Sequence, residues 1–378
     1  MTPLSPEDLA WLDRAADLAR PLLGTTAENP TVGAILVGRD SAEIAHGVTA
    51  PGGRPHAEIL ALEQAGGLTR GATLYVTLEP CSHWGRTPPC TDAVIRAGIA
   101  RVVVGIRDPD RRSGGKGIAR LAASGLDVAI AEHAGSQGLH EGHLMRARRG
   151  RPFVIAKLAV SADGKVGLPT HGPLPIVGAE AQEWIQRQRA TVDATMIGGA
   201  TARIDNPSLA VRIPGLERRT PRRVILVGRK PIDRRVELIG RVSPFPVLVL
   251  ASENVQLDLP PAIERVTVPG RDGRPILSEA LKALAQRGIA RLLVEGGPVL
   301  IEKLLVGELV DRFHLLSGRT EIGPRGIPAT GLGTIEARLE AARFRLVDEE
   351  PLGPDRLYTY EKQPGRAFSA VDAPRSQG

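Results

Sequence analysis

The feature that most constrains this chain is a group of three side chains, His56, Cys81 and Cys90, that can bind a transition metal. Imidazole nitrogen and thiolate sulfur are the usual protein ligands of zinc. Cys81 and Cys90 are the only cysteines among the 378 residues, so both thiols fall within one motif. The fold must therefore bring two separate loops to one point, which favours an architecture in which several loops meet at one edge of a sheet.

A glutamate follows the histidine by two positions, in the order His56-Ala57-Glu58. Histidine-x-glutamate with a later Pro-Cys and a second cysteine is typical of zinc-dependent deaminases. Zinc makes water a nucleophile at neutral pH, and Glu58 can carry protons from water to a ring nitrogen and to the departing amine. Because Cys81 follows Pro80, we predict that a helix starts there and favours the thiolate.

A structural zinc site is the alternative to a catalytic one. Structural sites close with four protein ligands, whereas catalytic sites keep three and leave a position open. His83 is the only nearby residue that could be the fourth ligand. The cysteine spacing also differs from the general deaminase form, with nine positions between Cys81 and Cys90 in place of three.

Alternating strand and helix patterns predict an α/β first domain over residues 1–149, with a largely parallel sheet after an opening hairpin. Ligands bind beyond the carboxyl ends of such strands, where the loops carrying His56 and Cys81 should meet. The predicted strands cover 32–37, 42–48, 73–77, 101–106 and 126–130, and helices start at Ser5 and near His56 and cover 88–97, 117–123 and 136–149.

An arginine cluster followed by glycine and proline predicts a boundary at residues 146–152, with a second domain over residues 150–362. Two of its strands end in Gly-Gly and lead into a helix, at Gly198-Gly199 and at Gly296-Gly297. Such junctions let backbone N–H groups approach a phosphate, although neither has the dinucleotide fingerprint and each alone is a common turn. Residues 363–378 are polar and aperiodic, and we expect them to be disordered.

The net charge of +7 lies entirely in the second part of the chain. Residues 1–150 contain 16 basic and 16 acidic side chains, whereas residues 151–378 contain 33 and 26. Small phosphorylated ligands fit this excess better than nucleic acid, because aromatic residues make up only 3% of the sequence. We expect no membrane partner and no signal peptide, and the absence of a disulfide framework fits a reducing cytoplasm.

Several motifs resemble the bifunctional deaminase/reductase family of riboflavin biosynthesis. They are Asn29-Pro30-Thr31-Val32-Gly33, His56-Ala57-Glu58, Thr77 to Cys90 with the nine-position spacing, Lys157 to Lys165, Thr201 to Arg212 and Glu295-Gly296-Gly297-Pro298. The resemblance implies a cytidine-deaminase-like three-layer α/β/α domain followed by a dihydrofolate-reductase-like α/β domain. It also implies Zn²⁺ and NADPH as cofactors, and we expect a homo-oligomer, either a dimer or a tetramer.

The implied reactions are hydrolytic deamination of a diamino-ribosylaminopyrimidinone phosphate and NADPH-dependent reduction of its ribosyl group to ribityl. Glu58 would be catalytic and His56, Cys81 and Cys90 would hold zinc. The residues implied to bind substrate are Asn29, His83, Arg189, Leu209, Arg212 and Glu295. The residues implied to bind NADPH are Ala159, Thr201, Asp205, Gly297, Pro298, Val299, Leu300, Ile301, Glu302 and Lys303, the last seven through their backbone.

The sequence departs from the family pattern at Pro173–Val177, Val227-Gly228, Ser317–Glu321 and Asp108–Arg111. Three of these departures fall in the second domain. One alternative is therefore a deaminase whose second domain no longer reduces, and another is a nucleic-acid-binding or editing protein with a basic appendage.

Overall fold

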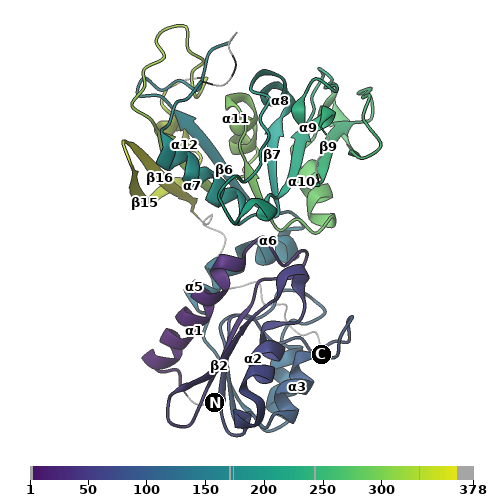
Figure 1. Ribbon diagram of the computed structural model, residues 1–378, viewed down its shortest axis with the longest axis vertical. Coiled ribbons are helices and arrows are strands. Elements are labelled where there is room, and N and C mark those ends of the chain that lie inside the picture. Colours follow the sequence, from purple (N-terminus) through teal and green to yellow (C-terminus); the bar gives the residue numbers. More distant parts are fainter. Residues whose placement is uncertain (1–2, 170–171, 173, 242–243, 332, 364–378) are drawn as a thin grey trace.

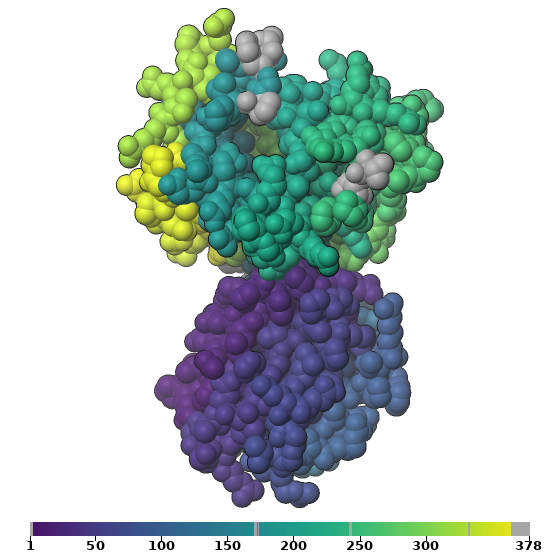
Figure 2. All heavy atoms as spheres, viewed as in Figure 1, coloured from purple at the N-terminus to yellow at the C-terminus, as the bar shows by residue number. Residues whose placement is uncertain are grey.

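The computed structural model describes residues 3–169, 172, 174–241, 244–331 and 333–363, and they form two domains (Figure 1). Residues 364–378, for which we expect disorder, lie outside this description. In the space-filling view the N-terminal domain forms one lobe, coloured purple to blue, and the rest of the chain forms the other (Figure 2). None of the described helices is long and apolar enough to span a bilayer.

The N-terminal domain is built on a five-stranded sheet in the order β2-β1-β3-β4-β5. As predicted, a hairpin opens it, and β3, β4 and β5 are parallel. Alternate side chains of β1 enter two different cores: Ile35 packs with Leu12 of α1, whereas Leu36 packs with Ala61 of α2. Helices therefore cover both faces, and the three-layer α/β/α prediction is confirmed. The elements are α1 (Pro6–Ala19), β1 (Gly33–Val37), β2 (Glu43–Val48), α2 (Ala57–Ala65), β3 (Thr73–Val76), α3 (Cys90–Arg96), β4 (Arg101–Val104), α4 (Lys116–Ala123), β5 (Asp127–Ile130), α5 (Ala134–Leu139) and α6 (Glu141–Arg149).

The single helix predicted over 136–149 is wrong, because the chain forms α5 and α6 with a break at His140. The backbone of His140 leaves the helical region, at φ −99° and ψ 11°. Its buried ring lies 3.0 Å, Nε2 to Oγ1, from Thr77 at the end of β3. This contact holds the break against the sheet and redirects α6 toward the second domain.

The C-terminal domain contains a nine-stranded sheet in the order β10-β9-β8-β7-β13-β6-β14-β16-β15. The seven strands from β10 to β14 in this order are parallel, and β16 and β15 add an antiparallel edge. The strands are β6 (Phe153–Val160), β7 (Ala194–Gly198), β8 (Arg222–Leu226), β9 (Val247–Ser252), β10 (Glu264–Val268), β13 (Arg291–Val294), β14 (Arg312–Ser317), β15 (Phe344–Leu352) and β16 (Asp355–Lys362), with a small separate hairpin of β11 (Gly270–Arg271) and β12 (Arg274–Pro275). The helices are α7 (Ala179–Arg189), α8 (Gly199–Ile204), α9 (Glu237–Gly240), α10 (Leu277–Gln286), α11 (Pro298–Val306) and α12 (Ile335–Ala341).

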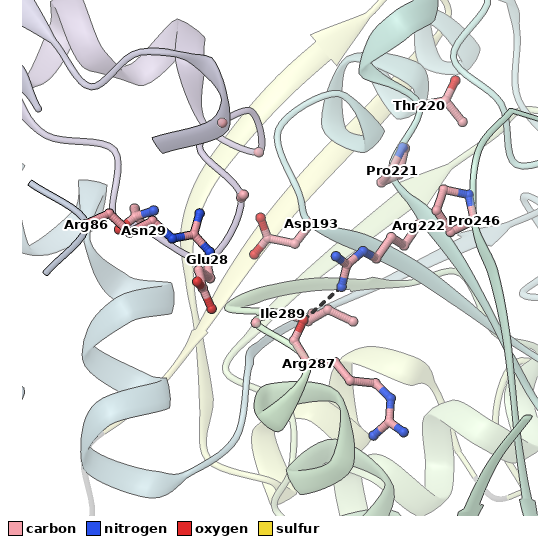
Figure 3. A pocket seen from close by; sticks show the side chains of 14 residues that line it. Glu28, Asn29, Arg86, Asp193, Thr220, Pro221, Arg222, Pro246, Arg287 and Ile289 are labelled. Carbon is pink, nitrogen blue, oxygen red and sulfur yellow. Dashed lines mark hydrogen bonds between the residues drawn. The ribbon is translucent and has the colours of Figure 1, made fainter. Parts of the chain in front are cut away.

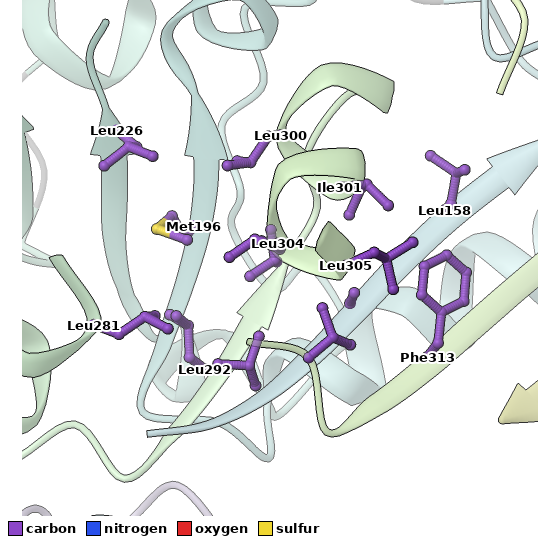
Figure 4. Packing of buried hydrophobic residues seen from close by; sticks show 14 of the residues in the cluster. Leu158, Met196, Leu226, Leu281, Leu292, Leu300, Ile301, Leu304, Leu305 and Phe313 are labelled. Atoms are coloured by element: carbon purple, nitrogen blue, oxygen red, sulfur yellow. The ribbon is translucent and has the colours of Figure 1, made fainter. Parts of the chain in front are cut away.

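Helix α11 supplies much of the core on one face of this sheet (Figure 4). Ile301 and Leu304 belong to the same cluster as Met196 of β7 and Phe313 of β14, and all four are almost completely buried. Truncating a buried phenylalanine such as Phe313 to alanine typically costs about 3–5 kcal/mol. The packing fixes α11, and with it the Gly296-Gly297 junction at its start.

A charged cluster joins the two domains. Glu141, the first residue of α6, forms ion pairs with Arg291 and with Arg312, the latter at 2.9 Å. Arg219 of the second domain donates to the backbone carbonyls of Pro21 and Leu23, each at 2.7 Å. These contacts link positions up to 198 residues apart in sequence, and they fix how the two domains face each other.

Candidate active site

The three predicted zinc ligands meet at one edge of the N-terminal sheet. His56 caps the start of α2, Cys81 lies in the loop after β3, and Cys90 is the first residue of α3. His56 Nδ1 lies 3.2 Å from Cys90 Sγ and 3.7 Å from Cys81 Sγ, and all three ligand atoms are within 4.8 Å of one another. Tetrahedral zinc with normal bond lengths separates nitrogen and sulfur ligands by about 3.6 Å. The two nitrogen–sulfur distances lie within a few tenths of an ångström of this value, so the group can hold zinc with small shifts of the side chains.

The group has no fourth protein ligand among the residues that the structure describes. His83, the candidate considered above, instead places Nδ1 3.3 Å from the hydroxyl of Ser113. The geometry is that of a site with three protein ligands and one open position, which is the catalytic form.

Glu58 lies in the first turn of α2 and is only 3% exposed. Burial, followed by the neighbouring Cys81 thiolate, raises the pKa of this carboxyl from its ordinary value of 4.5 to about 7. A divalent cation at the three ligands would favour the ionised form and lower this pKa again. The position of this buried carboxyl, two residues from the ligand His56, lets it take a proton from a water at the metal and release it again.

The predicted helix start at Cys81 is wrong, because residues 79–89 form no helix and α3 begins only at Cys90. Even so, the start of α3 supports the thiolate, since the backbone N–H of Cys90 donates to Cys81 Sγ at 3.3 Å. The hydrogen bond from the Cys90 thiol, with help from His56, lowers the pKa of Cys81 to about 4. The same bond raises the pKa of the buried Cys90 thiol. Cys81 is therefore a thiolate before zinc binds, and zinc has to displace the proton of Cys90.

Glu79, which the sequence reasoning did not single out, anchors the loops around the zinc ligands. Its buried carboxylate accepts N–H groups from Gly115 at 3.0 Å, Gly117 at 2.9 Å and Asp108 at 3.2 Å. Gly117 has to be glycine, because a Cβ there would lie 2.1 Å from the carbonyl oxygen of Pro80. The sequence feature that could have identified Glu79 is its position directly before Pro80-Cys81, as an acidic residue that is not itself a predicted metal ligand.

The second site lies at the carboxyl ends of the strands in the C-terminal domain. Glu295 follows β13 and receives a two-pronged bond from Arg189, at 2.6 and 2.9 Å, with Lys157 Nζ at 3.6 Å. Burial alone would raise the pKa of Glu295, but the two cations lower it overall. Lys157, on β6, has its own pKa lowered by burial. Lys157 belongs to a motif that resembles the family, and its position beside Glu295 puts it next to the predicted substrate residues.

The segment after α8 approaches the same network. Arg189 donates to the carbonyl of Ala210 at 3.2 Å, next to the buried Leu209. Asn206 and Leu209 both have positive φ, 43° and 54°, a strained conformation for such residues that is common at functional sites. Arg212 is exposed and its guanidinium lies 3.2 Å from Ser208 Oγ.

The two Gly-Gly junctions lie side by side, because β7 and β13 are neighbours in the sheet. A Cβ on Gly297 would lie 3.4 Å from Thr201 Oγ1, and one on Gly198 would lie 3.7 Å from Leu300. Leu300 and Ile301 point into the core, so only their backbone could face a cofactor. Asp205 ends α8, and burial raises its pKa. Of the other predicted cofactor residues, Pro298, Val299, Glu302 and Lys303 lie on α11, and Ala159 lies near the end of β6.

Two of the departures from the family pattern lie against each other. Ile176 and Val177 are buried beside Leu316 at the end of β14. The carbonyl oxygen of Ile176 occupies the position of a Cβ on Gly318, at 1.9 Å, so only glycine fits there. Pro173, in the same stretch, lies outside the described residues.

Family models match both parts of the chain. The cytidine and deoxycytidylate deaminase zinc-binding region matches residues 6–106, and the RibD C-terminal domain matches residues 152–358. Riboflavin biosynthesis protein RibD of Synechocystis is 34% identical over 361 residues, covering 93% of this chain and 95% of that protein. The Escherichia coli RibD is 34% identical over 367 residues, covering 92% and 98%.

Solved structures agree with the sequence relatives. RibD of Acinetobacter baumannii superposes with a TM-score of 0.83 at 30% identity, covering 95% of this chain and 99% of that one. The Thermotoga maritima diaminohydroxyphosphoribosylaminopyrimidine deaminase/5-amino-6-(5-phosphoribosylamino)uracil reductase superposes with a TM-score of 0.81 at 30% identity, covering 94% and 99%.

The fold and the two sites define a bifunctional enzyme, a zinc-dependent deaminase joined to an NADPH-dependent reductase. The chain belongs to the RibD family of riboflavin biosynthesis. The resemblance drawn from the motifs, the two domain folds and the cofactors are confirmed.

Proposed function

We propose that this chain removes the pyrimidine 2-amino group of a diamino-ribosylaminopyrimidinone phosphate at His56, Cys81 and Cys90, with Glu58 as the proton carrier. The observation that carries the proposal is the buried Glu58 carboxyl, two residues from a three-ligand group that fits zinc. Zinc would supply the Lewis acidity that makes water reactive at neutral pH. Glu58 accepts one proton from the attacking water and passes it to the ring nitrogen. It then takes the remaining proton from the added hydroxyl and delivers it to the amine, so that the C–N bond breaks, ammonia leaves and the carbonyl forms.

Asn29 and His83 are the proposed polar contacts for this substrate. Asn29 packs on the turn before His56, since a Cβ on Gly53 would lie 2.2 Å from its amide nitrogen. His83 lies between the two cysteine ligands in sequence and is steadied by Ser113. His83 therefore belongs to the loop between two zinc ligands, and Asn29, from the segment before β1, packs on the turn that leads to the third.

In the second domain, we propose that Arg189, Leu209, Arg212 and Glu295 bind the ribosyl phosphate and that Lys157 belongs to the same site. NADPH would supply the hydride for the ribosyl carbon. The cofactor would be held by Ala159, Thr201, Asp205 and the backbone of residues 297–303. The first turn of α11 places N–H groups and the positive end of the helix dipole there, which suits a phosphate.

We place the boundary between the deaminase and reductase domains after Arg149. Helix α6 ends at this residue, Gly150 is left-handed at φ 67°, and β6 begins at Phe153. The domains would then cover residues 1–149 and 150–362. We also expect a homo-oligomer in the cytoplasm that binds no nucleic acid, which the mass in solution and binding to RNA at low salt would test.

The test is incubation of the purified full-length protein with the phosphorylated pyrimidine, with and without NADPH, following ammonia and NADPH absorbance separately. Ammonia release without NADPH, followed by NADPH oxidation that depends on the deaminated intermediate, is the expected result. Ammonia release without any oxidation of NADPH or NADH would support the alternative, a deaminase whose second domain only binds ligand.

A further inference from the structure

A cleft of about 450 Å³ lies between the two domains (Figure 3). One wall comes from the deaminase domain and the other from the amino ends of strands in the reductase domain. The residues that face it include Glu28, Asn29, Gly52 and Arg86 on the first wall, and Asp193, Arg222 and Arg287 on the second. Nothing in the two reactions described above uses the second wall.

The deaminase wall combines the segment before β1 with two segments that carry zinc ligands. Gly52 belongs to the turn Pro51–Gly53 that leads to His56, and Asn29 packs on that turn. Arg86 lies in the loop that joins Cys81 to Cys90. The cleft therefore borders the turn before His56 and the loop between Cys81 and Cys90.

The reductase wall offers a guanidinium without a carboxylate partner. Arg222 is exposed at the start of β8, and its Nη1 donates to the carbonyl of Arg287 at 2.8 Å. Within the described part of the chain, Arg222 has no ion pair, whereas Arg287 is paired with Glu264 at 2.7 Å. The remaining donors of Arg222 are free to bind an anion in the cleft.

Two acidic residues also line the cleft, and they limit which anion fits. One oxygen of Asp193 is occupied by the N–H groups of Ala290 and Arg291, each at 2.8 Å. Glu28 stands near Arg86 and Asn29 in Figure 3 and can accept hydroxyl groups. A sugar phosphate matches this set, with its hydroxyls toward the carboxylate and its phosphate toward the forked arginine donors.

We propose that Arg222 of the reductase domain binds the phosphate of the pyrimidine during deamination, so that the second domain completes the substrate site of the first. The inference rests on the proposed deamination. The reductase site is not involved, because it lies at the other end of the strands. β8 begins at Arg222, and its last residue, Leu226, pairs with Gly198 just before α8, about 13 Å away.

The test is steady-state deamination by the full-length zinc enzyme and its Arg222→Ala variant. Loss of one charge-assisted contact should raise KM for the phosphorylated pyrimidine about 10- to 100-fold while kcat stays near the wild-type value. KM for the dephosphorylated nucleoside should be the same in both proteins. Reduction of the deaminated intermediate should be unchanged, and Arg222→Lys, which keeps the charge but loses the fork, should recover part of the loss.

Arg345→Ala is the matched control, because it removes an exposed arginine of the same domain, on β15, that does not face the cleft. Arg222→Ala with the KM of wild type overturns the proposal, and so does an equal rise in KM for the nucleoside. If Arg222→Ala loses both reactions through misfolding, Arg222→Lys decides. The quantity to compare is then the ratio of KM for the phosphorylated pyrimidine to KM for the nucleoside, and the same ratio in Arg222→Lys and wild type overturns the proposal. Failure of the wild-type enzyme to deaminate the phosphorylated pyrimidine at all would instead refute the proposed function.

Discussion

Removal of Arg189 should destabilise the reductase domain and not only weaken ligand binding. The side chains of Arg189 and Glu295 are 12% and 7% exposed, and the pair is joined by two hydrogen bonds. Breaking a buried ion pair from one side typically costs about 3–5 kcal/mol, because the remaining charge stays buried. Lys157, at 3.6 Å, compensates only in part. At about 2–4 °C per kcal/mol for a domain of this size, Arg189→Ala should lower Tm by about 6–20 °C.

The assay is thermal and urea unfolding of wild type and Arg189→Ala, with Arg187→Ala as the control. Arg187 lies on the same helix and pairs with Glu183, but both side chains are more than half exposed, at 57% and 53%. Such surface pairs contribute about 0–1 kcal/mol. If Arg189→Ala costs no more than Arg187→Ala, the buried pair does not stabilise the domain and the reasoning is refuted.

The pH dependence gives an independent check on the same pair. The folded-state pKa of Glu295 lies below its ordinary value of 4.5, so its ionisation stabilises the folded protein above that pH. This stabilisation is lost as the pH falls from 4.5 through the folded-state pKa. The stability gap between wild type and Arg189→Ala should therefore be constant at neutral pH and narrow below 4.5. A gap that widens on acidification would contradict this assignment.

Three further predictions concern the two active sites. Cys81→Ser and Cys90→Ser should each lose zinc by metal analysis, and full retention in both would refute the ligand assignment. Glu58→Gln should keep zinc and lose deamination by at least about a hundredfold, as expected for one acid–base group, so near-normal ammonia release would rule out that role. Asp205→Ala and Arg212→Ala should abolish NADPH oxidation while ammonia release continues, and loss of both activities would show that the sites are not independent.

Local patterns in the sequence predicted most of what positions the zinc site. The ligand motif, the strands that end before it and the helix that starts after His56 are all specified by nearby residues, and the structure places them as expected. The break at His140 was not predicted. Gly138 and Gly142 flank it, but a single glycine does not fix where a helix breaks, and the contact of the His140 ring with Thr77 lies 63 residues earlier in the sequence. Contacts at that separation cannot be read from periodicity.

Several strands and helices of the C-terminal domain were not predicted, because the hydrophobic pattern of their own residues is weak. In β15, the residues between Phe344 and Leu352 are exposed, so the alternation of a half-buried strand is absent. It is held at the sheet edge by pairing with β16. β10 and the short α12 were also not predicted, and each depends on packing against distant elements. The interdomain contacts of Glu141 with Arg291 and Arg312 are likewise set by the folded arrangement of both domains.

The departures from the family pattern in the reductase domain are easier to interpret once their positions are known. Ile176 and Gly318 belong to two different departures, yet each accommodates the other, since the Ile176 carbonyl fills the place of a Gly318 side chain. The two stretches are therefore packed against each other in this chain. The charged groups of the site, Lys157, Arg189 and Glu295, form a connected network that does not include the altered residues. The structure therefore favours a reductase that keeps its charged groups over a domain that has lost them.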